Sequence, residues 1–159
     1  MSLCHGSEDI PFRVYRKYLR VVILTENEDK TSIIEKIYNH PDLKNCPIEL
    51  TFKIIGKKWT PLILRDMFRG VTQFNRLLEN MDGLTPKVLT ERMRELQKGG
   101  IIRRTVITES PIRVKYELTD LGKQLEPVLV VAGTFSMNHL PKAIFKHGKA
   151  PRLEEILAQ

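Results

Sequence analysis

Apolar residues recur every three or four positions through most of the chain, which is the spacing of one face of an α-helix. In the middle of the chain this pattern predicts four helices, over residues 47–55, 61–69, 73–80 and 86–98. Proline in a first turn and glycine after a last turn mark several of their ends, because such a proline removes no helical hydrogen bond and glycine closes a helix readily. The hydroxyls of Thr60, Thr72 and Thr85 are expected to cap the helices that follow them.

The period changes from helical to alternating after Gly100. Residues 102–108 and 112–118 each alternate between apolar and polar side chains, as half-buried strands do. Residues 109–111 lie between them, so the pair is predicted to form a hairpin. A long apolar helix is expected from about residue 121 to residue 140, and Pro127 predicts a kink or a break within it.

The first 45 residues have a different pattern of apolar and basic residues. Residues 12–24 place apolar and basic side chains on opposite faces of a helix, with a strand as the alternative because β-branched and aromatic residues are common there. Ser32 and Glu35 have capping-box spacing for a short helix that ends near Tyr38. We therefore expect three parts: an N-terminal arm over 1–45, a central domain over 46–120, and a C-terminal helix with a tail over 121–159.

Composition and charge narrow the class of protein. With 159 residues and 42% apolar residues, the chain is expected to be a soluble protein with a real core. Two cysteines are too few for a disulfide scaffold, and no apolar run reaches the roughly 20 residues of a membrane span, so a cytoplasmic protein without a membrane partner is expected. The net charge is +7, of which +5 falls between Leu84 and Tyr116, where eight Lys and Arg residues stand against three Glu. This excess favours nucleic acid as the partner.

The order of the predicted elements agrees with the charge. Helices followed by a short turn, a further helix and a two-stranded hairpin are the order of a winged helix-turn-helix, in which the helix after the turn enters the major groove. The predicted fold class is therefore mainly α with a small β-hairpin (α+β): a winged helix-turn-helix with flanking N- and C-terminal helices. If Leu89, Met93 and Leu96 face the core of this domain, Lys87 and Arg94 face outward.

Four stretches in order carry a family resemblance: CPIELTFKIIGKKWTPLILRDMFRG, QFNRLL, LTPKVLTERMRELQKGGIIRRT and RVKYELTDLGKQLEPVL. Together they span about Cys46 to Ala132 and resemble the HxlR-type winged helix-turn-helix transcriptional regulators. The resemblance implies a sequence-specific DNA-binding regulator that acts as a homodimer on double-stranded operator DNA. It does not cover the N-terminal arm or the tail after Pro141.

The resemblance also implies which residues contact DNA. The segment from Thr85 to Lys98 is the expected recognition helix, and a wing residue is expected at the start of the second strand of the hairpin. Arg92 lies closer to the buried edge and is expected to pair with a neighbouring carboxylate. The expected contacts on the helix are Thr85, Lys87, Thr90 and Arg94, with Arg113 on the wing and Arg103, Arg104 and Lys115 as further contacts to the DNA backbone.

The predicted C-terminal helix gives a physical reason to expect a dimer. Its side chains between Leu125 and Phe135 are apolar nearly all round, and a domain of this size can hardly cover them alone. The helix near Leu50 and Phe52 and the arm 12–24 are further candidates for the same surface. The alternative, that the arm folds back on its own domain, stays open.

Cys46 directly precedes Pro47 at a predicted helix start, where free N–H groups and the helix dipole favour a thiolate. It also matches the cysteine at which similar regulators detect oxidants or electrophiles. The alternatives are a buried filler and a regulator that responds to a small-molecule effector with no thiol switch. No metal site, cofactor or catalytic arrangement is expected from the spacing of His, Cys, Ser and carboxylates, so no enzyme is predicted.

Two other classes of function remain open at this point. A winged helix can serve as a protein-interaction module without binding DNA. A cysteine-dependent enzyme built on Cys46 and His40 is the weaker alternative.

Overall fold

A computed structural model describes residues 40–109 and 112–149. The chain divides into two compact units, residues 1–60 and 61–159, and each is described by itself. The predicted helices over 12–24 and 32–38, and the last helical turn towards Gln159, lie outside the described residues.

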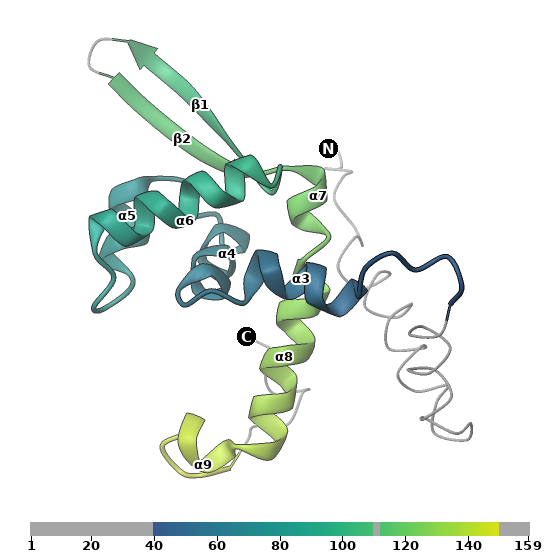
Figure 1. Ribbon diagram of the computed structural model, residues 1–159. Coiled ribbons are helices and arrows are strands. Elements are labelled where there is room, and N and C mark those ends of the chain that lie inside the picture. Colours follow the sequence, from purple (N-terminus) through teal and green to yellow (C-terminus); the bar gives the residue numbers. More distant parts are fainter. Residues whose placement is uncertain (1–39, 110–111, 150–159) are drawn as a thin grey trace, which may run out of the picture. The chain divides into compact units, whose positions relative to one another are not determined.

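In the first unit, helix α3 (Pro47–Ile55) begins and ends where the sequence predicts (Figure 1). Pro47 occupies the first turn, and the N–H of Gly56 donates to the carbonyl of Phe52 at 2.7 Å to close the helix. Glu49 forms an ion pair with Lys53 one turn later, at 2.8 Å, and this contact lowers the pKa of Glu49. Trp59, in the turn after α3, has a φ of 78°, a left-handed conformation that is uncommon for a residue with a side chain.

Three helices follow in order: α4 (Thr60–Phe68), α5 (Phe74–Glu79) and α6 (Pro86–Lys98). The predicted cap at Thr85 is confirmed, because its hydroxyl oxygen accepts the N–H of Val88 at 3.3 Å. The other two predicted caps are wrong. Thr60 is the first residue of α4 rather than the residue before it, and Gln73 precedes α5 without a side-chain cap.

The core of the second unit joins these three helices to the start of the hairpin. Each contributing side chain is at most 7% exposed, and burial of a side chain of this size is worth about 1.5 to 3 kcal/mol. The buried apolar residues of this unit are Ile63, Leu64, Met67, Leu77, Met81, Leu84, Leu89, Met93, Leu96, Ile101 and Ile102. The predicted inward stripe of α6, Leu89, Met93 and Leu96, is thereby confirmed.

The hairpin consists of β1 (Ile102–Glu109) and β2 (Ile112–Leu118), which pair antiparallel (Figure 1). Its register runs from Ile102 opposite Leu118 to Val106 opposite Val114, and it shifts between Val106 and Thr108, where β1 carries one extra residue. The N–H of Tyr116 on β2 donates to the carbonyl of Thr72 at 2.8 Å, which ties the hairpin to the segment before α5.

After β2 the chain is helical again, in three pieces: α7 (Asp120–Lys123), α8 (Glu126–His139) and α9 (Pro141–Ile144). The predicted interruption at Pro127 is a break rather than a kink, and Pro127 lies in the first turn of α8. The structure thus confirms a mainly helical winged helix-turn-helix with a small hairpin, which helix α8 follows later in the chain. Among the described residues, no helix is both long enough and apolar enough to cross a bilayer.

Candidate nucleic-acid interface

Helix α6 has one buried face and one charged face. Leu89, Met93 and Leu96 are at most 2% exposed. The exposed side chains Lys87, Glu91, Arg94 and Lys98 follow one another at spacings of four, three and four, which places them in one stripe along the helix. The core therefore fixes α6 in position, while three cations and one carboxylate line its outer face.

Thr85 and Thr90, two of the predicted contact residues, differ in how far they are exposed. Thr85 is exposed, and its hydroxyl oxygen accepts the N–H of Val88 as the helix cap, which leaves the hydroxyl hydrogen and one oxygen lone pair for other partners. Thr90, one turn further on, is half-buried. Lys87 is the charged and exposed residue in the first turn of α6. The N-terminal residues of a recognition helix commonly contact base edges.

A buried carboxylate holds the turn that leads into α6, and sequence reasoning missed it. Asp66 on α4 is fully buried and accepts hydrogen bonds from Arg65 Nε at 2.9 Å and from Asn80 Nδ2 at 3.0 Å. Asn80 closes α5 just before the turn at residues 81–84. Breaking a buried, charge-assisted contact of this kind is costly, so Asp66 keeps the turn, and with it the start of α6, in place.

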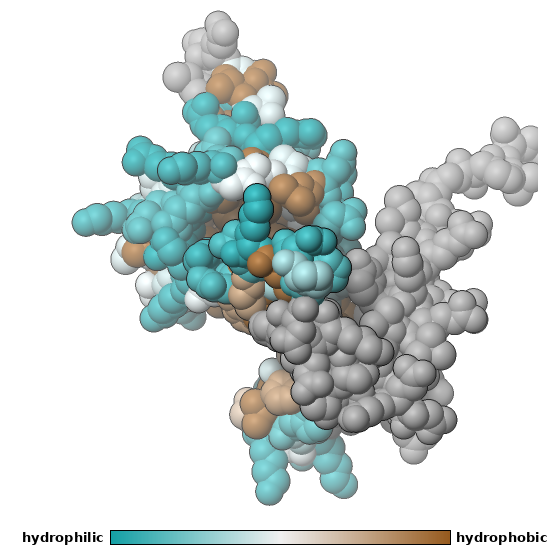
Figure 2. Space-filling view, turned by 45° about the vertical axis from the view of Figure 1, so that its right-hand side comes forward, coloured by the Kyte–Doolittle hydropathy of each residue, from teal (hydrophilic) through white to brown (hydrophobic). Residues whose placement is uncertain are grey.

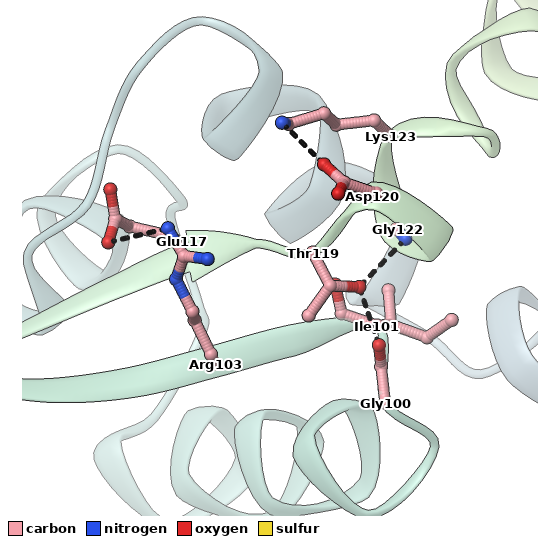
Figure 3. Close-up of polar contacts among 8 residues, drawn as sticks. All are labelled: Gly100, Ile101, Arg103, Glu117, Thr119, Asp120, Gly122 and Lys123. Carbon is pink, nitrogen blue, oxygen red and sulfur yellow. Dashed lines mark hydrogen bonds and ion pairs between the residues drawn. The ribbon is translucent and has the colours of Figure 1, made fainter.

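The base of the hairpin is fixed by Thr119 (Figure 3). Its hydroxyl donates to the carbonyl of Gly100 at 2.6 Å and accepts the N–H of Gly122 at 3.0 Å, and its own N–H donates to the carbonyl of Ile101 at 2.9 Å. A side chain at Gly122 would collide with the carbonyl of Ile101, so only glycine fits there. One threonine therefore joins the end of α6, the start of β1 and the cap of α7.

Two of the predicted backbone-contact cations on the hairpin are held by one carboxylate. Glu117 Oε1 lies 2.8 Å from Lys115 Nζ, and Glu117 Oε2 lies 3.4 Å from Arg103 Nη2, across the strand pair (Figure 3 shows the Arg103 pair). The hydrogen bond from Lys115, with the positive charge of Arg103 nearby, lowers the pKa of Glu117 below its ordinary value. Glu117 did not stand out in the sequence, because only the strand register brings it opposite Arg103.

The remaining cations of this region divide into two classes. As predicted, Arg92 pairs with carboxylates, Glu95 at 2.9 Å and Glu91 at 3.2 Å, and its side chain is only 15% exposed. Among the side chains that the structure describes, no carboxylate forms an ion pair with any of the other five cations between Leu84 and Tyr116. These five are all exposed: Lys87, Arg94, Lys98, Arg104 and Arg113.

The outer part of the hairpin combines apolar and basic side chains. Val106 is 45% exposed and Ile107 is 59% exposed, and Ile107 is the extra residue at the shift in register. In Figure 2 a group of apolar residues lies near the upper end of the coloured part of the view, above a band of hydrophilic residues. Arg113, the predicted wing residue, lies opposite Thr108 beside this shift. An apolar strand end flanked by arginine can contact deoxyribose as well as phosphate.

Cys46 lies in the first unit, at the start of α3. Its Sγ atom accepts the N–H of Glu49 at 3.5 Å, so the thiol itself is the cap of the helix. The residue is partly exposed, and it is not part of a disulfide. The predicted place of Cys46 at a helix N-terminus is confirmed by this contact.

Helix α8 differs from the other long helices because none of its residues is buried. Val131 and Phe135 are 54% and 60% exposed, and Leu140 after the helix is 53% exposed. Leu125 and Leu129, which belong to the stretch predicted to be apolar nearly all round, are partly covered. Helix α3 likewise exposes apolar side chains, with Phe52 at 57%. Apolar surface of this extent is typical of an interface with another protein.

Chemically, the described residues offer charge, hydrogen-bond donors and apolar surface. No group of three or more His, Cys, Asp or Glu residues that could hold a metal ion occurs in the described part of the chain. The exposed cations of α6 and of the hairpin beside it form a positively charged surface, which is suited to binding a grooved polyanion such as a nucleic-acid duplex.

Comparison with known proteins gives consistent results. Residues 54–143 match the family model described as HxlR-like helix-turn-helix. The chain is 38% identical over 93 residues to the HTH-type transcriptional regulator YdeP of Bacillus subtilis strain 168. The aligned residues make up 58% of this chain and 73% of YdeP. The redox regulator HypR in its oxidized form has a TM-score of 0.56 and 33% identity, over 59% of this chain and 97% of HypR. The reduced form of the transcriptional regulator YodB from B. subtilis has a TM-score of 0.54 and 31% identity, over 60% of this chain and 94% of YodB.

Proposed function

The chain belongs to the HxlR-like helix-turn-helix family of transcriptional regulators, and from this premise we propose that it binds operator DNA through α6 and the β1–β2 hairpin. One observation carries the proposal: five exposed cations that no carboxylate of the described residues pairs with are concentrated on α6 and the hairpin, while the opposite face of α6 is anchored in the core. Affinity for DNA depends strongly on cations that can neutralise phosphates, and this surface supplies them on a rigid helix and the adjoining wing.

Individual roles follow from exposure and pairing. Lys87 and Arg94 lie in the exposed stripe of α6 and are assigned to the major groove, where Lys and Arg contact guanine or phosphate. Arg104 and Arg113 on the hairpin are assigned to the phosphates beside the groove. Thr85 and Thr90 are assigned supporting hydrogen bonds through their hydroxyl groups. Arg103 and Lys115 are weaker contacts, because Glu117 already holds them.

The regulator is proposed to act as a homodimer whose interface includes α8. A helix of 14 residues with no buried side chain, carrying exposed Val131 and Phe135, is explained best by a second copy that covers it. A two-fold dimer would place its two α6 helices on half-sites about one turn of DNA apart, roughly 34 to 36 Å, or a multiple of that distance.

Cys46 is proposed as the residue that responds to oxidants or electrophiles. Its Sγ atom caps α3, so oxidation changes the group that holds the first turn of this helix. The proposal is supported by two similar proteins: the redox regulator HypR has solved structures in oxidized and reduced forms, and YodB has one after diamide treatment. A small-molecule effector is the alternative signal.

The experiment that tests DNA binding is selection of bound duplexes from a randomised pool, followed by binding measurements over a range of salt concentrations. A common sequence is expected, together with a steep, linear loss of log affinity with log salt. If no sequence is enriched and no salt-dependent binding of duplex DNA is measured, the result would favour a winged helix that binds only proteins.

Diamide treatment of the full chain tests the thiol. Binding of the selected duplex is expected to change on treatment in wild type and in the Cys4→Ser control, and to stay unchanged in Cys46→Ser. Serine is a good cap residue, so this substitution keeps α3 intact. An equal response to diamide in the Cys46→Ser variant would contradict the assignment.

A further inference from the structure

Glu117 is an acidic residue inside a surface that is proposed to bind DNA. Its side chain is only 28% exposed, and its two carboxylate oxygens each hold a cation: Lys115 at 2.8 Å along the strand, and Arg103 at 3.4 Å across the strand pair (Figure 3 shows the Arg103 contact). Both cations lie in the region of high positive charge, and the Arg103–Glu117 pair also links β1 to β2 across the register. Besides this structural contact, the carboxylate removes positive charge from a surface that is proposed to bind DNA.

The charge of this cluster explains what the carboxylate does. Arg103, Lys115 and Glu117 together carry +1 instead of the +2 that the two cations would carry alone. A cation that holds a carboxylate at 2.8 Å must leave it or share its hydrogen bonds before it contacts a phosphate. Each phosphate contact that is prevented in this way lowers the affinity for DNA and its dependence on salt.

The effect differs between arbitrary DNA and the operator. On DNA of arbitrary sequence, binding depends essentially on cations and phosphates, and the protein adopts many orientations, so that any released cation finds a phosphate. On the operator, base contacts from α6 fix one orientation, and a released hairpin cation gains affinity only where a phosphate lies within its reach. Neutralising the hairpin therefore reduces non-specific binding more than specific binding.

We propose that Glu117 is a specificity-determining residue: by holding Arg103 and Lys115 it limits the phosphates that the wing neutralises on DNA of arbitrary sequence. The inference rests on the proposed function and extends it to the discrimination between operator and other DNA. Glu117 acts through the two cations rather than by touching DNA.

The test is Glu117→Gln in the full chain, with binding to a random-sequence duplex and to the selected operator measured by fluorescence anisotropy over a range of salt. The slope of log affinity against log salt on the random duplex is expected to steepen by about 0.9 for each phosphate gained, and thus by up to about 1.8. The affinity for the random duplex is expected to rise more than the affinity for the operator.

A matched control separates this local effect from net charge. Glu49→Gln changes the net charge of the chain by the same +1, but Glu49 holds Lys53 at 2.8 Å on α3, which is not part of the proposed interface. Its slope is expected to equal that of wild type. An equal change of slope in the two variants, or no change in Glu117→Gln, overturns the proposal.

A second pair of variants tests whether Glu117 acts through Lys115. Lys115→Gln is expected to change the slope little in wild type and by about 0.9 in the Glu117→Gln background, where the lysine is released. The same change in both backgrounds overturns the proposal. If the Glu117→Gln variant unfolds, Glu117→Thr replaces it in the comparison of salt slopes, because threonine is well suited to a strand.

The controls also separate this inference from the function on which it rests. Wild-type protein that binds no duplex in a salt-dependent way contradicts the proposed function. Wild-type protein that binds with a steep slope, alongside an unchanged Glu117→Gln variant, contradicts only the role of Glu117.

Discussion

Helices α6 and α8 are of similar length, 13 and 14 residues, but they relate to the rest of the chain in opposite ways. Helix α6 buries three apolar side chains and turns a charged stripe outward. Helix α8 buries none and exposes large apolar side chains such as Phe135. Helix α6 is held in place by packing against the core of its own chain, whereas α8 has an apolar surface that the described part of the chain does not cover.

The contrast separates the two tasks of a DNA-binding regulator. A helix that reads DNA must be held rigidly, because recognition depends on placing a few side chains accurately, and a buried stripe provides that. A helix that joins two copies must keep its apolar surface available until the partner arrives. Substitutions on the two helices should therefore affect different measurements.

The largest expected effect is on folding. Leu89→Ala removes a fully buried side chain from α6 and should lower the free energy of unfolding by about 2 to 5 kcal/mol, measured by urea denaturation at one protein concentration. Lys87→Ala, on the exposed face of the same helix, is the control and should change it by less than about 0.5 kcal/mol. Equal decreases in the two variants would mean that α6 is not anchored through its apolar stripe.

The second effect is on assembly. Phe135→Glu places a charge in the exposed apolar surface of α8 and should convert the proposed dimer into a monomer in sedimentation experiments, with far-UV circular dichroism unchanged. Asn138→Asp, an exposed residue on the same helix, adds charge without removing an apolar side chain and should leave the dimer intact. A dimer that survives Phe135→Glu would move the interface away from α8.

The third effect is on DNA affinity. Replacing both Lys87 and Arg94 with alanine should weaken operator binding by about 1 to 3 kcal/mol for each base that the variant no longer reads, without changing the unfolding curve. Lys53→Ala combined with Lys142→Ala removes the same charge from α3 and α9 and serves as the control. An equal decrease of affinity in both double variants would indicate that only net charge matters.

The smallest effect is expected on the hairpin. Arg113→Ala should weaken binding to all duplexes alike and reduce the salt slope by about 0.9, because one phosphate fewer is neutralised. A decrease of affinity confined to one base position of the operator would instead show that Arg113 reads sequence.

Much of the fold could be predicted from local signals, because those signals act over a few residues. Thr85 before Pro86 marked the start of α6, and Pro127 marked the break before α8. The charge excess between Leu84 and Tyr116 indicated the surface of the candidate site. At finer detail the local signals failed, since Thr72 precedes α5 by two residues and does not cap it.

The interactions that shape the site could not be predicted in this way. Asp66 and Asn80 are 14 residues apart, and Arg103 and Glu117 are also 14 apart, so each pair meets only because of tertiary packing or strand register. The extra residue at Ile107 coincides with two adjacent apolar residues, Val106 and Ile107, but only the pairing with β2 shows that β1 has a bulge there. Which cations of the basic region are compensated therefore depends on the folded structure and not on the local sequence.

Hydrogen–deuterium exchange of the full chain, with and without the selected operator duplex, tests the central claim most directly. Slower exchange on DNA binding is expected in α6 and in the β1–β2 hairpin, with α8 exchanging at the same rate in both states. Slower exchange on α8, with α6 and the hairpin unchanged, would contradict the assignment of the DNA-binding surface.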